Sequence, residues 1–187
     1  MFTTLEAECV KLGAFRSKVI DCERVIFHPD FRKMCEQNSC GKYGKCYTCP
    51  PDIGDIEDLI AEAKRYRYAL VYQTVSPLED SFDIEGMMDA EKKHHRLGLD
   101  IRHIFSRPDL TDALHLNAGA CGVCDVCAKE TGEPCRVPGL ATSSLEAYGI
   151  YVSELAKSAE MLYTNGQNTV TYFGAVFFNT NESETSL

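Results

Sequence analysis

Tyr68-Ala-Leu-Val-Tyr-Gln-Thr-Val75 is a run of apolar, aromatic and β-branched residues, which is the composition that β-strands favour. The segment directly before it, residues 54–67, carries apolar residues at helical spacing and acidic residues in its first turn, which predicts a helix. A second strand-like run, residues 169–178, lies near the end of the chain. A helix that leads into a strand is typical of proteins in which helices pack against a sheet.

The remaining patterns predict a single small domain of the α/β (α+β) class. Alternating residues around 17–27 indicate a further strand, so a sheet of three or four strands is expected. The domain is expected to cover residues 1–178, and the polar residues 179–187 are expected to form a disordered tail. Further helices are predicted over 82–106 and 143–161, and a short helix can form at 109–115.

Composition excludes several classes of protein. The chain has 187 residues, of which 44% are hydrophobic and 25% are charged, as is ordinary for one globular domain. The net charge of -9 argues against a nucleic-acid partner, which would require clustered Lys and Arg. No apolar stretch of about 20 residues is present, so no membrane partner is expected. The charged N-terminus does not read as a secretory signal, and we therefore expect a cytoplasmic protein.

Cysteine is the unusual residue of this chain, with 10 copies, most of which fall between residues 35 and 49 or between residues 121 and 135. Disulfide frameworks are typical of small exported domains. Closely spaced cysteines in a chain large enough to form its own core are more typical of metal sites. We therefore interpret the two groups as metal ligands in a reducing compartment.

The second group has the spacing Cys121-x2-Cys124-x2-Cys127-x7-Cys135. Bacterial ferredoxins use cysteines at such x2 intervals, and a further cysteine beside a proline, to hold [4Fe-4S] clusters. Here Pro134 stands directly before Cys135. A tetrahedral zinc site with the same four thiolates is the alternative. Zinc sites more often use two separated C-x2-C pairs, so the spacing favours iron and sulfur.

The first group has the spacing Cys35-x4-Cys40-x5-Cys46-x2-Cys49 and ends in a pair of prolines. Its four thiols are enough for a second [4Fe-4S] cluster, although the spacing is less regular than in the second group. The predicted metal ligands are therefore two sets of four cysteines, each set supplied by one short segment. Two [4Fe-4S] clusters are the expected cofactors, with zinc as the alternative.

Two strings of residues resemble the signatures of a known family. The first runs from Cys35 through a Tyr-Gly pair to Cys49-Pro-Pro, and the second joins residues 121–138 to the segment Ser144-Leu-Glu-Ala-Tyr-Gly-Ile150. On these motifs, residues 30–178 resemble a family of predicted metal-binding proteins of unknown function that is common in anaerobic bacteria and archaea. The resemblance implies that this chain binds metal.

Whether Cys46 is a ligand of the first cluster distinguishes two possible mechanisms of this protein. The family signature that the first group resembles has three constant cysteines, which match Cys35, Cys40 and Cys49, and Cys46 falls where the family usually lacks one. If Cys46 is a ligand, the first cluster has four cysteine ligands and can only carry electrons. If Cys46 is not a ligand, one iron keeps a position for water or substrate and can act as a Lewis acid. The sequence leaves both alternatives open.

The leading hypothesis is an iron–sulfur protein with two [4Fe-4S] clusters that transfers electrons or serves as a redox accessory to an anaerobic enzyme. Its acidic surface suits a basic redox-protein partner. One alternative is an enzyme that uses an open iron of the first cluster on a small molecule, and another is a zinc-stabilised interaction module. The sequence assigns no catalytic residue and does not decide whether the protein is an enzyme.

Other cysteines and histidines are weaker candidates. Cys9 and Cys22 are expected to be small buried hydrophobic residues rather than spare ligands. His28, just before the first group, is an unusual candidate for a fourth ligand. On the long predicted helix, His95 lies two turns before Arg102, which suggests a local polar network.

Overall fold

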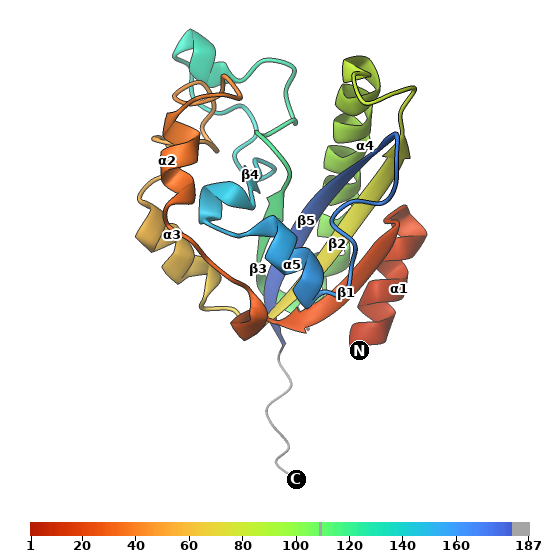
Figure 1. Ribbon diagram of the computed structural model, residues 1–187. Helices are drawn as coiled ribbons and strands as arrows, with labels where there is room; N and C mark the ends of the chain where they lie inside the picture. The colour runs from red at the N-terminus through yellow and green to blue at the C-terminus, as the bar shows by residue number, and fades with distance from the viewer. Residues whose placement is uncertain (109, 181–187) are drawn as a thin grey trace.

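The computed structural model describes residues 1–108 and 110–180, which form an open five-stranded sheet and several helices (Figure 1). In spatial order the strands are β1 (Arg16–Asp21), β2 (Tyr68–Pro77), β5 (Thr169–Thr180), β3 (Leu110–Asn117) and β4 (Ser143–Ser144). Neighbouring strands are antiparallel, except that β3 and β4 are parallel. The two longest strands, β2 and β5, therefore pair with each other inside the sheet.

Helices cover both faces of this sheet (Figure 1). They are α1 (Phe2–Leu12), α2 (Phe31–Glu36), α3 (Ile56–Ala63), α4 (Ile84–Arg102) and α5 (Val152–Ser158). The core on one face joins α1 and α4 to strand residues such as Leu70 and Phe178. The core on the other face joins α3 and α5 to Val71 and Phe177, which are adjacent in sequence to Leu70 and Phe178. Since successive strand residues point to opposite faces, both strands are apolar without alternation in their middle parts.

Strand β3 occupies the place of the short helix that the sequence allows at 109–115, and that prediction is wrong. Of this range, residue 109 lies outside the described residues, and the rest belongs to a strand that pairs with β5. The pairing is irregular around Asp112, which has a φ of 53°. Leucine and alanine in this segment suit a helix, but pairing with β5 buries Leu110 and Leu116. Tertiary contacts therefore override the local preference.

The helix predicted over 143–161 is much shorter than expected. Its first residues form strand β4, a 3₁₀ turn follows at Glu146–Tyr148, and only Val152–Ser158 is α-helical. Gly149 separates the turn from the helix with a φ of 72°, a left-handed conformation that glycine adopts without strain. Because β3 and β4 join the sheet, it has five strands rather than the expected three or four.

The other predicted elements lie where expected, with different ends. The helix predicted over 54–67 is the shorter α3, and the one predicted over 82–106 is α4 followed by a 3₁₀ turn at Ile104–Ser106. Strand β5 extends to Thr180, beyond the boundary predicted at residue 178. The rest of the predicted tail, residues 181–187, lies outside the described residues. In the described ranges no helix is long and apolar enough to cross a membrane.

Gly174 is a position where the sheet has no room for a side chain. It lies opposite Tyr72 in β2, and a Cβ atom there would be 2.3 Å from the phenol oxygen of Tyr72. Tyr72 is buried and its ring has little space to move. We expect Gly174→Ala to lower the free energy of unfolding by about 2 kcal/mol through overpacking, as measured by urea unfolding. Gly139→Ala is the control, because a Cβ atom there meets nothing within 4 Å. Equal stability of the two variants would contradict this account.

Candidate metal centre

The two cysteine groups lie side by side at one end of the sheet (Figure 1). The first group lies on α2 and in the loop after it, and the second lies in the loop between β3 and β4. The Tyr47 hydroxyl donates a hydrogen bond to the carbonyl oxygen of Glu133 at 2.7 Å. Lys129 forms an ion pair with Asp52. Both contacts join one loop to the other, so the fold brings together two groups that are far apart in the sequence.

A cavity of about 320 Å³ opens at the first group. Three of the four cysteines in that group, Cys35, Cys40 and Cys49, line it. One carboxyl group, that of Glu146 in the 3₁₀ turn before α5, also faces it, and burial raises the pKa of this carboxyl. The other walls are mostly apolar and include Phe31, Met34, Tyr43, Pro50, Ala120 and Ala147.

The second group lines a much smaller cavity of about 20 Å³. This volume is close to that needed by one water molecule. All four cysteines of the second group line it, and one cysteine of the first group joins them. These five residues are Cys46, Cys121, Cys124, Cys127 and Cys135. The structure therefore places the eight predicted ligands as three and five around the two cavities, whereas the sequence predicts four and four.

Cys46 lies between the two cavities. Its side chain is 2% exposed, and its sulfur lies 3.3 Å from the hydroxyl oxygen of Thr48. A hydrogen bond with the thiol of Cys49 lowers the pKa of Cys46, and a hydrogen bond from the backbone of Cys121 acts in the same direction. Cys46 therefore contacts a cysteine of the first cavity and the backbone of a cysteine of the second.

Burial raises the pKa of a thiol in each cavity, Cys35 in the first and Cys121 in the second. The positive charge of Arg32, one turn before Cys35 on α2, opposes this effect. Two guanidinium nitrogens of Arg32, Nε and Nη2, are buried without a hydrogen-bond partner within the part of the chain that the structure describes. A cation beside Cys35 favours the thiolate, which is the form that binds metals.

Helix α4 supports the loop that carries the second group. The Nε2 atom of His95 lies 2.8 Å from the carbonyl oxygen of Ala118. The other ring nitrogen would lie 1.9 Å from a Cβ atom at Gly122, so the ring contacts the backbone of this loop directly. Arg102 donates hydrogen bonds to three successive carbonyl oxygens and to the hydroxyl of Thr142, the shortest at 2.9 Å. Spacing along the helix pointed to both residues, but it did not show that their partners are in the segment between β3 and β4.

Three of the weaker candidates, Cys9, Cys22 and His28, do not line either cysteine cavity. Cys9 and Cys22 are 0% and 6% exposed and belong to the two hydrophobic cores, as expected for small buried residues. His28 packs its ring against Phe31 and Tyr151 and is not among the residues that line either cavity. The structure therefore does not bring His28 to the first group as a further ligand.

His94 is a structural histidine between α4 and the sheet. Its ring stacks on Tyr72 with 5.3 Å between the ring centroids, and its Nδ1 atom lies 2.8 Å from the hydroxyl oxygen of Thr74. Burial lowers the pKa of His94 to about 3. The ring is therefore neutral at physiological pH and is a buried structural group between α4 and the sheet.

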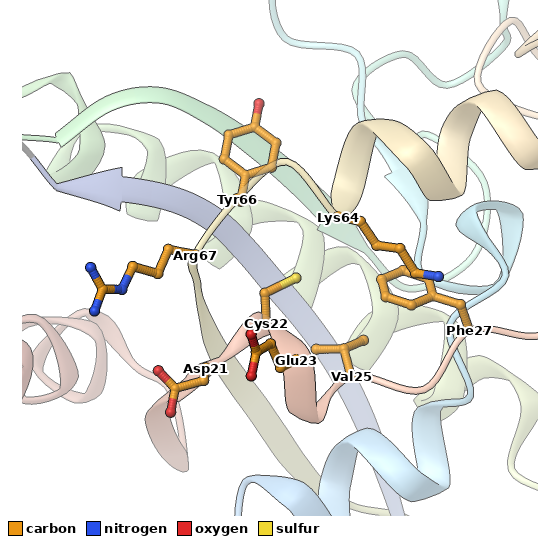
Figure 2. A pocket seen from close by; sticks show the side chains of 8 residues that line it. All are labelled: Asp21, Cys22, Glu23, Val25, Phe27, Lys64, Tyr66 and Arg67. Carbon is orange, nitrogen blue, oxygen red and sulfur yellow. The ribbon is translucent and has the colours of Figure 1, made fainter.

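A separate hollow of about 770 Å³ lies beside the end of β1 and the end of α3 (Figure 2). The ammonium group of Lys64 lies over the ring of Phe27, 5.3 Å from its centroid. The thiol of Cys22 donates a hydrogen bond to the carbonyl oxygen of Ala63 at 3.5 Å. The residues that line this hollow offer one thiol, already directed at the backbone, and so lack the grouped ligands of the two cysteine cavities.

Free thiols at two adjacent cavities define this molecule as a cysteine-rich α+β protein. Within residues 1–108 and 110–180, no three His, Cys, Asp or Glu side chains already stand close enough together to hold a metal ion. The chain belongs to the family described as predicted metal-binding protein (DUF2284), which matches residues 18–178. The expected membership of a metal-binding family is thus confirmed. No curated protein and no solved structure matches the chain.

Proposed function

We propose that this protein holds two [4Fe-4S] clusters, one at each cysteine cavity, and works as an electron-transfer protein. The observation that carries the proposal is the grouping of eight cysteines around two adjacent cavities, with Cys46 linking them. Thiolates are the usual ligands of such clusters. Adjacent sites suit electron transfer, because an electron then has a short path between them.

The donor type, cysteine thiol, suits clusters at both positions, and the thiols of the second cavity would move apart to admit one. The second cavity offers the four cysteine thiols that a [4Fe-4S] cluster uses, with Cys46 as a fifth. The first cavity offers three, which would leave one iron without a cysteine ligand. When bound, the clusters would supply one-electron chemistry, and the first would also supply a Lewis-acidic iron.

The protein itself contributes charge and shielding around the second cavity. Tyr47 lines the cavity, and the ammonium group of Lys129 lies over its ring, 5.3 Å from the centroid. Arg136, on the same wall, donates a hydrogen bond to the carbonyl oxygen of Val126 at 3.1 Å. Cations near a negatively charged centre favour its reduction. With a net charge of -9, the protein as a whole would attract a basic redox partner in a reducing cytoplasm.

A second candidate function is favoured by the size of the first cavity. With three thiols it encloses about 320 Å³, whereas the cavity with five thiols encloses about 20 Å³. A volume of about 300 Å³ or more is typical of sites for small molecules. An enzyme that acts on a small molecule here would combine a substrate cavity with an adjacent redox site.

Cys46→Ser tests how the ligands are divided. We expect this variant to keep the iron and sulfide of both sites, because three cysteines remain at the first cavity and four at the second. Cys49→Ser is the matched comparison and should lose about half of the iron and sulfide. Iron and acid-labile sulfide per chain after anaerobic purification measure both results. If both variants lose about half of the iron and sulfide, Cys46 is a ligand of the first cluster and the open-iron enzyme is ruled out.

Electron transfer is tested by reduction with dithionite under anaerobic conditions. We expect the electron paramagnetic resonance spectrum of the reduced protein to show two [4Fe-4S] centres that interact magnetically, because the two cavities are adjacent. A protein that takes up no electrons would contradict the electron-transfer function.

A further inference from the structure

The first cavity is lined by apolar side chains and one carboxyl group, which have no role in electron transfer. Its walls beyond the thiols are aromatic and aliphatic, with Phe31 and Met34 from α2 and Tyr43 from the following loop. No Lys, Arg or His is among the described residues that line it, and the one carboxyl group is that of Glu146. The cavity therefore has an apolar body and a single charged side chain besides its thiols.

The first cavity is the larger of the two cysteine cavities. Five cysteines at the second cavity leave about 20 Å³ between them, whereas three cysteines at the first cavity leave about 320 Å³. A cluster held by the three thiols would take part of this volume. The rest of the lining is mostly apolar, and Met34 in it is 60% exposed. Apolar walls of this kind bind the apolar part of a small molecule.

The charges at this cavity select among small molecules. A carboxylate in an apolar wall is stabilised by a cationic partner, and charge-assisted hydrogen bonds between such groups are stronger than neutral ones. Glu146 lies on the 3₁₀ turn before α5, which packs against α2, and Ser144 is its hydrogen-bonding neighbour. The lining offers one carboxylate and no cationic side chain, while the cation next to it, Arg32, acts on Cys35, so the lining favours a cationic ligand over an anionic one.

We propose that the first cavity binds a small primary amine with an apolar body. The ammonium group pairs with the Glu146 carboxylate, and the apolar body fills the space between Phe31, Met34 and Tyr43. This inference rests on the proposed function, because it assigns the thiols of the same cavity to a cluster rather than to the ligand. It makes Glu146 a residue that determines specificity.

Three probes of nearly equal size test the inference: benzylamine, benzyl alcohol and benzoate. Binding to the anaerobically purified protein, with its iron content measured, is followed by calorimetry or ligand-observed nuclear magnetic resonance. We expect benzylamine to bind at least about tenfold more tightly than benzyl alcohol, and benzoate not to bind, because only the amine forms the charge-assisted bond. Glu146→Gln should reduce the affinity for benzylamine to that for benzyl alcohol and leave the affinity for benzyl alcohol unchanged.

Two further variants show whether a change in binding comes from the first cavity or from a general effect of substitution on the protein. Glu23→Gln removes a carboxylate at the separate hollow and should preserve the preference for benzylamine. Ala120→Leu fills part of the cavity and should weaken the binding of both benzylamine and benzyl alcohol, as measured per iron-containing chain. A protein that contains iron but does not prefer benzylamine, or a preference that survives Glu146→Gln, overturns the inference alone. A protein without iron overturns the proposed function as well.

Discussion

A variant that carries both Cys46→Ser and Cys124→Ser should lose about half of its bound iron and sulfide. Cys124 is a ligand candidate of the second cavity, but Cys46 lines the same cavity and can replace it as the fourth thiol. The double substitution leaves three thiols there and removes the substitute. Unlike the first cavity of about 320 Å³, this cavity of about 20 Å³ has no space beside a cluster for the water or substrate that would complete the fourth iron. Because metal binding contributes to folding, we also expect the variant to unfold at lower urea concentration. Iron and sulfide analysis, the visible spectrum and urea unfolding measure these effects.

The controls for this prediction lie in the same loops. Val126→Ser changes an exposed residue between Cys124 and Cys127 and should leave the iron content unchanged. Cys124→Ser alone should lose less iron than the double variant, because Cys46 remains available. A double variant with full iron content would show that the second cavity is not the site of a four-cysteine cluster.

The second large effect concerns acid stability. Burial lowers the pKa of His94 to about 3, whereas the pKa of a histidine in an unfolded chain is about 6.5. Between these two values the unfolded state binds a proton that the folded state does not, so stability falls as the pH falls through this window. From this residue alone we expect the free energy of unfolding to be about 2 kcal/mol lower at pH 5 than at pH 7.5.

Comparison with His94→Gln isolates this contribution. The variant removes the proton-binding group, so its free energy of unfolding should depend less on pH than that of the wild type, by about 2 kcal/mol over the same interval. Urea unfolding at the two pH values measures the difference. His103→Gln, at the exposed end of the same helix, is the control and should behave like the wild type. An identical pH dependence in His94→Gln and wild type would refute the account.

The parts of the fold with strong periodicity could be predicted from the sequence. Strand β2 is buried on both faces, so its sequence is a continuous apolar run around Val71, and this run predicts the strand. The acidic residues around Glu57 mark the first turn of a helix and predict α3. Strand β3 could not be predicted, because Leu110 and its neighbours are stabilised by pairing with β5, a segment far away in the sequence. Strand β4 is two residues long and has no pattern of its own.

The candidate site, like the fold, could be predicted only where it depends on residues close together in the sequence. Spacing alone identifies the eight grouped cysteines, because short intervals bring thiols together whatever the rest of the fold does. It could not place Cys46, which lies close in sequence to Cys49 but lines the cavity of the other group. Nor could it identify Glu146, which reaches the first cavity only because the segment before α5 packs beside α2. Contacts between distant segments determine both positions.

The measurement that tests the central claim most directly is the content of iron, acid-labile sulfide and zinc in the anaerobically purified protein. Two [4Fe-4S] clusters predict about eight iron and eight sulfide per chain, with negligible zinc, in a brown protein. A colourless protein that contains zinc and no sulfide would contradict the proposal and indicate a structural metal site.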